Sequence, residues 1–191
     1  MFFIYRLLTN LIFIFSPIII LIRLLKKKEH PTRFKEKFGI YTKKKLEGKL
    51  IWFHGASVGE ILSIIPLIEK LEKKNNIKQI LVTSNTLSSS TILSNLKLKK
   101  TIHQFFPIDT VYHTNKFLRY WKPSMAIFID SEIWPNMINN IKKQSATLIL
   151  INARITNKSF KRWKIFNLSA KHIFQKFDIC FSSNLKSKNF L

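Results

Sequence analysis

The sequence predicts an α/β protein in which a Rossmann-like parallel sheet follows an apolar N-terminal helix. Two observations support this fold. Short apolar runs alternate with helical stretches from residue 50 onward, and the first 25 residues are almost wholly apolar. Strands made of continuous apolar residues are buried on both faces, which is typical of a parallel sheet covered by helices. Since 46% of the 191 residues are hydrophobic, the chain can form a buried core.

The predicted strands are short, and a helical segment separates each from the next. We expect strands at Leu50–Phe53, Gln79–Thr83, His103–Phe106, Met125–Ile129, Thr147–Ile151 and Ile179–Phe181. We expect helices at Glu60–Lys74, Leu87–Leu96, Tyr112–Trp121, Trp134–Lys143 and Phe160–Phe177. Ligands of parallel sheets bind beyond the carboxyl ends of the strands, so the loops at those ends are where chemistry is expected.

The N-terminal segment Phe2–Leu25 is long enough for one membrane span, which needs about 20 residues. Arg6 and Arg23 lie near its ends, where long side chains reach the membrane surface. Basic residues follow the segment, so the positive-inside rule leaves the rest of the chain in the cytoplasm. A helix lying in the membrane interface is the alternative, because Asn10 and Pro17 weaken a clean span.

These features divide the chain into three parts: a membrane anchor at residues 1–25, a basic linker with an amphipathic segment at 26–49, and a Rossmann-like domain at 50–191. The net charge of +23 favours anionic partners such as nucleic acid, acidic lipid or phosphorylated sugar, although a compositional bias explains part of it. Cys180 is the single cysteine and the histidines show no ligand spacing, so we expect no disulfide and no metal.

The loop His54–Glu60 follows a predicted strand and opens a helix. Its glycines, Gly55 and Gly59, permit a tight turn and the close approach of a ligand to the backbone. Ser57 and Glu60 have the spacing of a capping box, so plain helix capping is one interpretation. In the other, Glu60 lies at the helix N-terminus on the carboxyl edge of the sheet. The helix dipole keeps its carboxylate ionised there, ready to accept a proton from a bound hydroxyl.

Two acids, Asp130 and Glu132, follow the fourth predicted strand and precede Trp134 and Pro135. They place a second carboxylate on the same edge of the sheet. The alternative interpretation is a helix N-terminus with Pro135 in its first turn.

A third loop, Asn152–Thr156, follows the fifth predicted strand and contains Arg154, with Arg162 further along the chain. The guanidinium of Arg154 is suited to clamp a phosphate or a carboxylate. A solvated arginine without a ligand is the alternative.

The three loops, in this order, resemble those of the Kdo (3-deoxy-D-manno-octulosonic acid) transferases of lipopolysaccharide synthesis. That family shows His-x-Ala-Ser-Val-Gly-Glu, then Thr/Ser-Glu-Leu/Ile-Trp-Pro-Asn, then Asn-Ala-Arg. Further matching segments are Arg33–Gly39, His103–Asp109 and Trp121–Pro123. The resemblance covers essentially all 191 residues, and several motifs in one order make it specific.

The resemblance implies a GT-B architecture of two Rossmann-like domains, with residues 50–191 as the N-terminal, acceptor-binding one. It implies that Glu60 is the proton acceptor and that Glu132 is a second essential acid that helps to stabilise the transition state. The expected acceptor-binding residues are Ser57, Gly59, Arg154 and Arg33. Family members are much longer, so we expect the C-terminal domain that binds the donor CMP-Kdo to be absent from this chain.

The predicted reaction is the transfer of Kdo from CMP-Kdo to a lipid A precursor, lipid IVA, at the inner membrane, with no cofactor and no metal. Two alternatives stay open: an inactive membrane-bound remnant that still binds the lipid, and a basic nucleic-acid-binding protein. The latter gives no reason for an apolar anchor or for acids at strand ends, so we expect no nucleic-acid partner.

Overall fold

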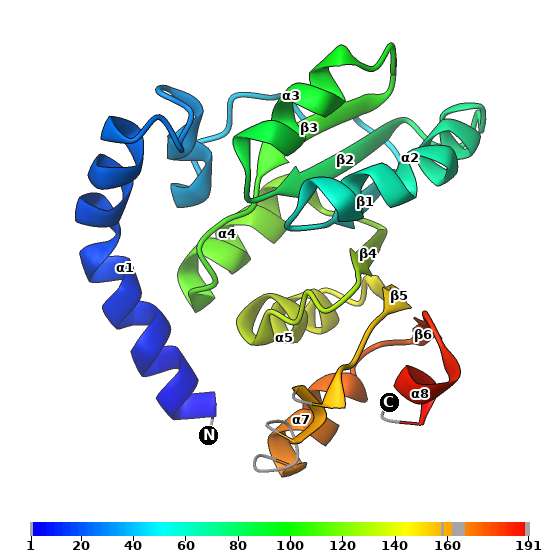
Figure 1. Cartoon of the computed structure of the whole chain (residues 1–191). Coiled ribbons are helices and arrows are strands. Elements are labelled where there is room, and N and C mark those ends of the chain that lie inside the picture. The colour runs from blue at the N-terminus through cyan, green and yellow to red at the C-terminus, as the bar shows by residue number, and fades with distance from the viewer. Residues whose placement is uncertain (1, 158, 162–166, 190–191) are drawn as a thin grey trace.

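The computed structural model describes residues 2–157, 159–161 and 167–189, which form a six-stranded parallel sheet with helices on both faces (Figure 1). The strands are β1 (Leu50–His54), β2 (Gln79–Ser84), β3 (Thr101–Phe105), β4 (Met125–Ile129), β5 (Thr147–Ala153) and β6 (Ile179–Ser182). Every neighbouring pair runs parallel. The α/β class predicted from the sequence is confirmed, and each strand begins and ends within two residues of its expected bounds.

The longer helices that follow the first strand alternate with the strands along the chain. They are α2 (Val58–Glu72), α3 (Leu87–Asn95), α4 (Val111–Trp121), α5 (Pro135–Lys143) and α7 (Asn167–Phe174). Helices α2 and α3 pack Ile61, Ile64 and Leu93 onto one face of the sheet, while α4, α5 and α7 pack side chains such as Phe117 and Ile138 onto the other (Figure 1).

Two short helices were not expected from the sequence: a 3-10 helix, η1 (Arg33–Phe38), and α8 (Leu185–Lys188). Neither is long enough to show an apolar periodicity. Of the helix expected at Phe160–Phe177, residues 162–166, and Arg162 with them, lie outside the described residues.

The strand order is β3-β2-β1-β4-β5-β6. Strands β2 and β3 are added on one side of β1, and strands β4, β5 and β6 are then added on its other side. Strand β1 therefore pairs with both β2 and β4, and His54 lies in register with Phe128 of β4. In open parallel sheets the reversal of strand order leaves a crevice at the carboxyl ends of the two central strands, where ligands bind. Here the strand order reverses between β1 and β4.

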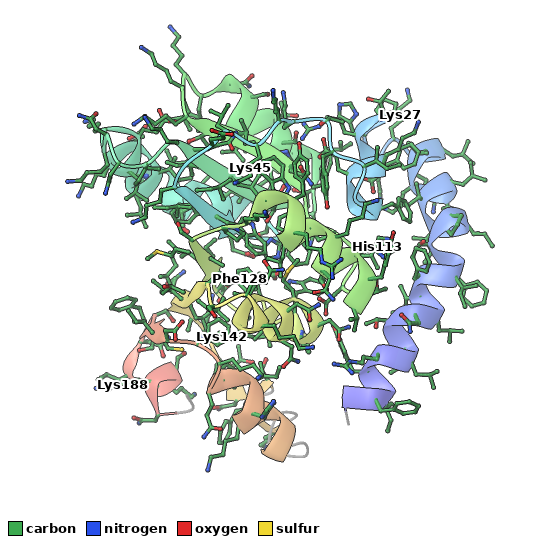
Figure 2. All side chains as sticks on the ribbon, turned by 180° about the vertical axis from the view of Figure 1, so that it is seen from behind. Lys27, Lys45, His113, Phe128, Lys142 and Lys188 are labelled. Carbon is green, nitrogen blue, oxygen red and sulfur yellow. The ribbon has the colours of Figure 1, made fainter. Side chains whose placement is uncertain are left out.

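The apolar helix α1 (Phe2–Leu25) lies along the flank of the sheet domain and does not project away from it (Figure 1). One stripe of its surface faces the domain: Thr9, Ser16 and Ile20 are buried. Near its start the Tyr5 hydroxyl donates a 2.7 Å hydrogen bond to Asp109, and midway along it the Phe13 ring centroid lies 4.8 Å from that of His113 on α4. Figure 2 shows His113 on the side of α4 that faces α1.

The opposite surface of α1 is apolar and exposed. It carries Phe3, Ile4, Leu7, Leu11, Ile14, Phe15, Ile18, Leu21, Ile22 and Leu25. The helix is long and apolar enough to cross a membrane, and only 17% of its candidate span is buried. It is therefore a candidate membrane anchor, as the sequence predicts.

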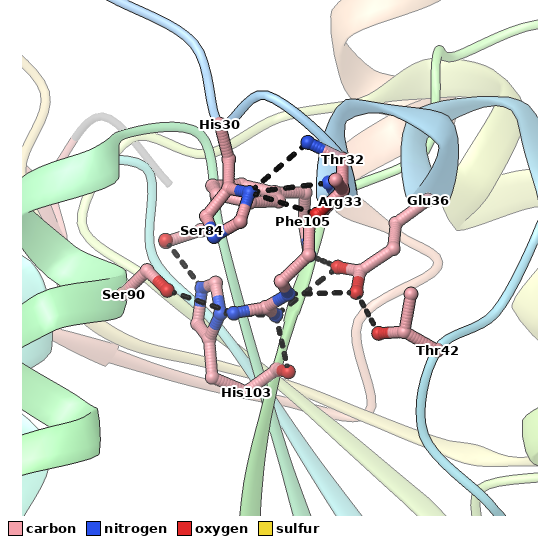
Figure 3. A network of polar contacts seen from close by, with 9 residues as sticks. All are labelled: His30, Thr32, Arg33, Glu36, Thr42, Ser84, Ser90, His103 and Phe105. Carbon is pink, nitrogen blue, oxygen red and sulfur yellow. Dashed lines mark hydrogen bonds and ion pairs between the residues drawn. The ribbon is translucent and has the colours of Figure 1, made fainter.

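A buried ionic network holds η1 against β3 (Figure 3). Glu36, which is fully buried, receives two hydrogen bonds from the Arg33 guanidinium, at 2.9 and 3.2 Å, and one from the backbone N–H of Phe105 at 2.8 Å. The same guanidinium donates to Ser90 on α3 and to the carbonyl oxygen of His103 on β3. A buried charge pair of this kind is stable only with such added hydrogen bonds, and it fixes the position of the segment before β1.

The buried imidazole of His103 makes stability depend on pH. Burial, with the nearby charges of Arg33 and Lys43, lowers the pKa of His103 to about 3. Between that value and the unfolded pKa of about 6.5 only the unfolded chain binds the proton, so stability is lost as pH falls below about 6.5.

Replacing His103 with Gln should remove this contribution, because glutamine does not titrate in this range. The fall in unfolding free energy between pH 7 and pH 5 should become smaller by roughly 2 kcal/mol, measured by chemical denaturation at both pH values. Equal pH dependence in wild type and His103→Gln would contradict the argument.

Candidate functional site

The loop after β1 holds Glu60 in the first turn of α2. Its backbone N–H donates to Ser57 Oγ at 3.3 Å, and the Ser57 hydroxyl donates to Glu60 Oε1 at 2.7 Å. The second carboxylate oxygen, Oε2, accepts from the backbone N–H of Ala56 at 2.8 Å. Ser57 thus caps the helix, as its spacing from Glu60 predicts, while the Glu60 carboxylate accepts from Ala56, the residue before the cap. The bonds from Ser57 and Ala56 orient this partly exposed carboxylate at the carboxyl edge of the sheet.

The two glycines of this loop have different roles. A Cβ atom added at Gly55 would lie 3.0 Å from Glu60 Cβ, so the Glu60 side chain packs directly on the Gly55 backbone. A Cβ added at Gly59 would meet nothing within 4 Å. The described fold therefore gives no packing reason for a glycine at position 59, where alanine would favour the helix by about 0.5–1 kcal/mol.

The loop after β4 carries Glu132 to the same edge of the sheet. Its first residue, Asp130, has a left-handed backbone (φ 59°), which aspartate tolerates better than most residues and which turns the chain sharply after the strand. Glu132 Oε2 accepts a 2.7 Å hydrogen bond from Trp134 Nε1 and lies 3.3 Å from His54 Nε2. Burial opposes ionisation of Glu132, but the interaction with His54 and the bond from Trp134 outweigh it, so its pKa is lowered.

His54, the last residue of β1, is fully buried behind Glu132. Its ring stacks on Phe106 at a centroid distance of 3.8 Å, and its Nδ1 lies 3.0 Å from Thr83 Oγ1 and 3.3 Å from the Thr83 carbonyl oxygen. The Thr83 hydroxyl has one hydrogen to donate, either to the carbonyl of Phe53 at 3.3 Å or to His54 Nδ1 at 3.0 Å. The imidazole tautomer decides which group is the donor in the Nδ1 contact.

His54 Nε2, on the other side of the ring, faces the Glu132 carboxylate. Among the described residues Nε2 has no aligned hydrogen-bond partner, and Glu132 Oε2 is the polar atom that it faces. A lone pair buried against a carboxylate is repulsive, whereas a proton on Nε2 turns the contact into an ion pair. The His54–Glu132 pair therefore holds a proton between its two side chains.

Arg154 lies at the end of β5, next to the Glu132 loop. Its backbone carbonyl accepts a 2.5 Å hydrogen bond from Ser131 Oγ, and it lines a small cavity of about 120 Å³ together with Asp130. Arg154 is exposed, and within the described part of the chain its guanidinium forms no hydrogen bond or ion pair. The guanidinium is free to bind an anion, as the sequence interpretation requires.

The structure gives Arg33 a different environment from the other predicted site residues. Its guanidinium is engaged by Glu36, Ser90 and His103 in the network of Figure 3, and only 19% of the side chain is exposed. An acceptor-binding role for Arg33 remains a prediction, since most of its donors already have partners.

The sequence interpretation did not assign roles to His54 or Trp134, although both stand in the quoted motifs. Their positions at the end of β1 and just after Glu132 were the available signal. Among the described residues no group of three or more His, Cys, Asp or Glu side chains is arranged to hold a metal ion.

Comparison with known proteins gives a consistent result. The family profile described as 3-deoxy-D-manno-octulosonic-acid transferase matches residues 32–191. A protein named 3-deoxy-D-manno-octulosonic acid transferase from Rickettsia bellii is 45% identical over 162 residues, which cover 83% of this chain and 38% of that protein. A probable mitochondrial transferase of the same name from Arabidopsis thaliana is 38% identical, over 84% of this chain and 37% of its own length.

Among solved structures, a UDP-N-acetylglucosamine 2-epimerase is similar in fold, with a TM-score of 0.53 and 12% sequence identity over 75% of this chain and 44% of that one. At this identity the similarity concerns the fold alone. This chain spans less than two fifths of the length of the Rickettsia and Arabidopsis relatives.

The proton held by the His54–Glu132 pair gives a direct spectroscopic prediction. In ¹⁵N-histidine-labelled protein, Nε2 of His54 should show the chemical shift of a protonated ring nitrogen, because it faces the Glu132 carboxylate. In the Glu132→Gln variant the amide N–H can donate to Nε2, so Nε2 should lose its proton. An unprotonated Nε2 in the wild-type protein would contradict this assignment.

Proposed function

This chain belongs to the 3-deoxy-D-manno-octulosonic-acid (Kdo) transferase family, and we propose that it is the acceptor-binding half of an enzyme that transfers Kdo from CMP-Kdo to a lipid A precursor, lipid IVA. The observation that carries the proposal is the position of two carboxylates. Glu60 follows β1 and Glu132 follows β4, and these paired strands flank the crevice where strand order reverses.

Glu60 is the general base of the proposed reaction. Its two oxygens are held by the Ser57 hydroxyl and the Ala56 N–H, and each keeps a lone pair for an incoming hydroxyl. The acceptor oxygen attacks the anomeric carbon of Kdo, the bond from that carbon to the phosphate oxygen of CMP breaks, and the hydroxyl proton passes to Glu60. General-base assistance of this kind contributes about 10²–10⁴ in rate.

Glu132 is the second acid of the proposed site. Its lowered pKa keeps it ionised at neutral pH, and His54 and Trp134 hold its carboxylate in place. We assign it to stabilisation of the charge that develops in the transition state. Ser57, Gly59 and Arg154 are proposed to contact the acceptor, Arg154 through a phosphate.

Donor binding is assigned to a second domain. The chain matches 38% of the Rickettsia relative, so CMP-Kdo is proposed to bind through the portion of the longer proteins that this chain does not match. The complete site would then lie between two Rossmann-like domains, as in a GT-B enzyme.

The proposed location is the inner membrane, with α1 as the anchor. Two buried contacts near the start of α1, at Tyr5 and Thr9, support a helix that lies in the membrane interface. A perpendicular span would carry Tyr5 about 27 Å from Arg23 across the bilayer and away from Asp109. In the interfacial arrangement the exposed apolar surface of α1 enters the membrane while its other side stays on the domain.

The central test is Glu60→Gln, assayed in a fusion of this chain to the donor-binding domain of a relative. The amide still accepts a hydrogen bond from the Ala56 N–H, so the free energy of unfolding should change by only about 1 kcal/mol. Turnover should fall by about 10² or more, because an amide is not a base at neutral pH. Retained turnover would remove Glu60 from the base role, and an inactive wild-type fusion would count against the proposed reaction.

Gly59→Ala separates folding from ligand binding at the same loop. The methyl group meets open space and favours the helix, so the free energy of unfolding should stay equal or rise by about 0.5–1 kcal/mol. If the acceptor approaches the backbone here, the KM for lipid IVA should nevertheless rise. Leu62→Ala, at an exposed position one turn later in α2, is the control and should leave KM unchanged. An unaltered KM in Gly59→Ala would exclude close approach of the acceptor.

A further inference from the structure

A cavity of about 550 Å³ lies between α1 and the loop that follows β3. This volume falls within the range of about 300–1,000 Å³ that is usual for small-molecule sites. Its walls are mostly apolar, with Leu8 and Ile12 of α1 on one side and Phe106, Ile108 and Trp134 on the other. No step of the proposed reaction uses this cavity.

The inner wall of the cavity is shared with the candidate site. Trp134 lines the cavity and donates its indole N–H to Glu132 at 2.7 Å. Phe106 lines it as well and stacks on the ring of His54. A molecule in the cavity would therefore contact the same aromatic side chains that hold the Glu132 carboxylate and its partner.

Two cations, Arg23 and Lys37, line the cavity. Both pair with a single oxygen, Glu29 Oε2, at 2.9 and 2.6 Å. One carboxylate against two cations leaves an excess of one positive charge in a partly buried setting, which favours an anionic group such as a phosphate.

The one acid that lines the cavity, Asp109, does not oppose such a group directly. Its carboxylate accepts hydrogen bonds from the Tyr5 hydroxyl, near the start of α1, and from the backbone N–H groups of Asn136 and Met137. Arg23 lies near the other end of α1, so the excess of one positive charge belongs to the end of the cavity at Arg23, Lys37 and Glu29.

The cavity is continuous with the exposed apolar surface of α1. Leu8 and Ile12 line it, yet they remain 51% and 55% exposed, and the neighbouring residues Leu7 and Leu11 belong to that surface. An acyl chain could thus enter from the membrane without crossing water, and its removal from water is favoured by about 0.8 kcal/mol for each CH₂ group.

From the apolar walls, the excess positive charge and this continuity, we propose that the cavity binds one acyl chain of the acceptor lipid, with an acceptor phosphate at Arg23 and Lys37. The inference rests on the proposed function, because that function identifies the amphiphile as the acceptor. It adds a lipid subsite, formed by the anchor and the domain together, that delivers the acceptor sugar to the edge carrying Glu60 and Glu132.

A bulky side chain placed in the cavity tests whether the cavity binds an acyl chain. Leu8→Trp places a large ring at its wall, while Leu7→Trp adds the same ring to the outer surface of α1 and is the matched control. We expect Leu8→Trp to weaken binding of radiolabelled lipid IVA in detergent micelles by about tenfold, and Leu7→Trp to change it by less than about twofold. Wild-type affinity in Leu8→Trp would overturn the proposal.

A second pair of variants tests whether an acceptor phosphate binds at Lys37. Lys37→Gln should weaken binding of lipid IVA about fivefold but not that of its dephosphorylated form, because only the phosphate meets the lysine. Lys35→Gln, at an exposed lysine of the same short helix, should leave both affinities unchanged. Equal loss for the two lipids would exclude a phosphate at Lys37.

Two further measurements distinguish binding of the acceptor from misfolding of a variant and from general binding of membrane lipid. In the wild-type chain, lipid IVA with a photoreactive acyl chain should label the peptides that contain Leu8 or Ile108, and labelling confined to other peptides would overturn the subsite even if Leu8→Trp does not fold. Equal weakening of lipid IVA and phosphatidylglycerol by Leu8→Trp would show a general membrane-lipid site and exclude the acceptor. Either result leaves the Glu60→Gln test of the proposed function intact.

Discussion

The parallel pairing of β1 with β4 is the constraint on which the candidate site depends. These strands are far apart in the sequence, and their pairing places the loop that begins at His54 beside the loop that carries Glu132. Neighbouring strands lie about 4.8 Å apart, so two carboxylates at adjacent strand ends can act on one bound molecule. If β1 paired with β5 instead, Glu60 and Glu132 would be separated by a further strand and His54 would lose its contact with Glu132.

Buried polar groups then determine how each side chain of the site is held. The hydroxyl of Thr83 accepts a hydrogen bond from Trp52 and contacts Nδ1 of His54, and this contact holds the imidazole with Nε2 toward Glu132. Each group in this chain of contacts is desolvated, so removal of one leaves another unpaired at a cost of about 1–3 kcal/mol. The site is consequently more rigid than its position on loops would suggest.

Asp109 connects the apolar helix to the edge of the sheet that carries Glu132. Its carboxylate accepts from Tyr5 of α1 and from the backbone N–H groups that begin α5, the helix entered directly after Glu132. Burial raises the pKa of Asp109 to about 6 against the opposing effect of these hydrogen bonds. The orientation of α1 on the domain, and with it the shape of the cavity beside α1, is therefore tied to the same segment that positions the second carboxylate.

The sequence by itself determined the strands and the longer helices of the described residues, because their apolar periodicity is local. Apolar runs predicted the six strands of the sheet, and the spacing of Ser57 and Glu60 predicted the Ser57 cap on the Glu60 N–H. Only the tertiary structure decided the strand order, the contact of His54 with Glu132, the engagement of Arg33 by Glu36, and the lie of α1 along the domain. These features join residues that are distant in the chain. Local periodicity carries no information about which distant groups become neighbours in the folded protein.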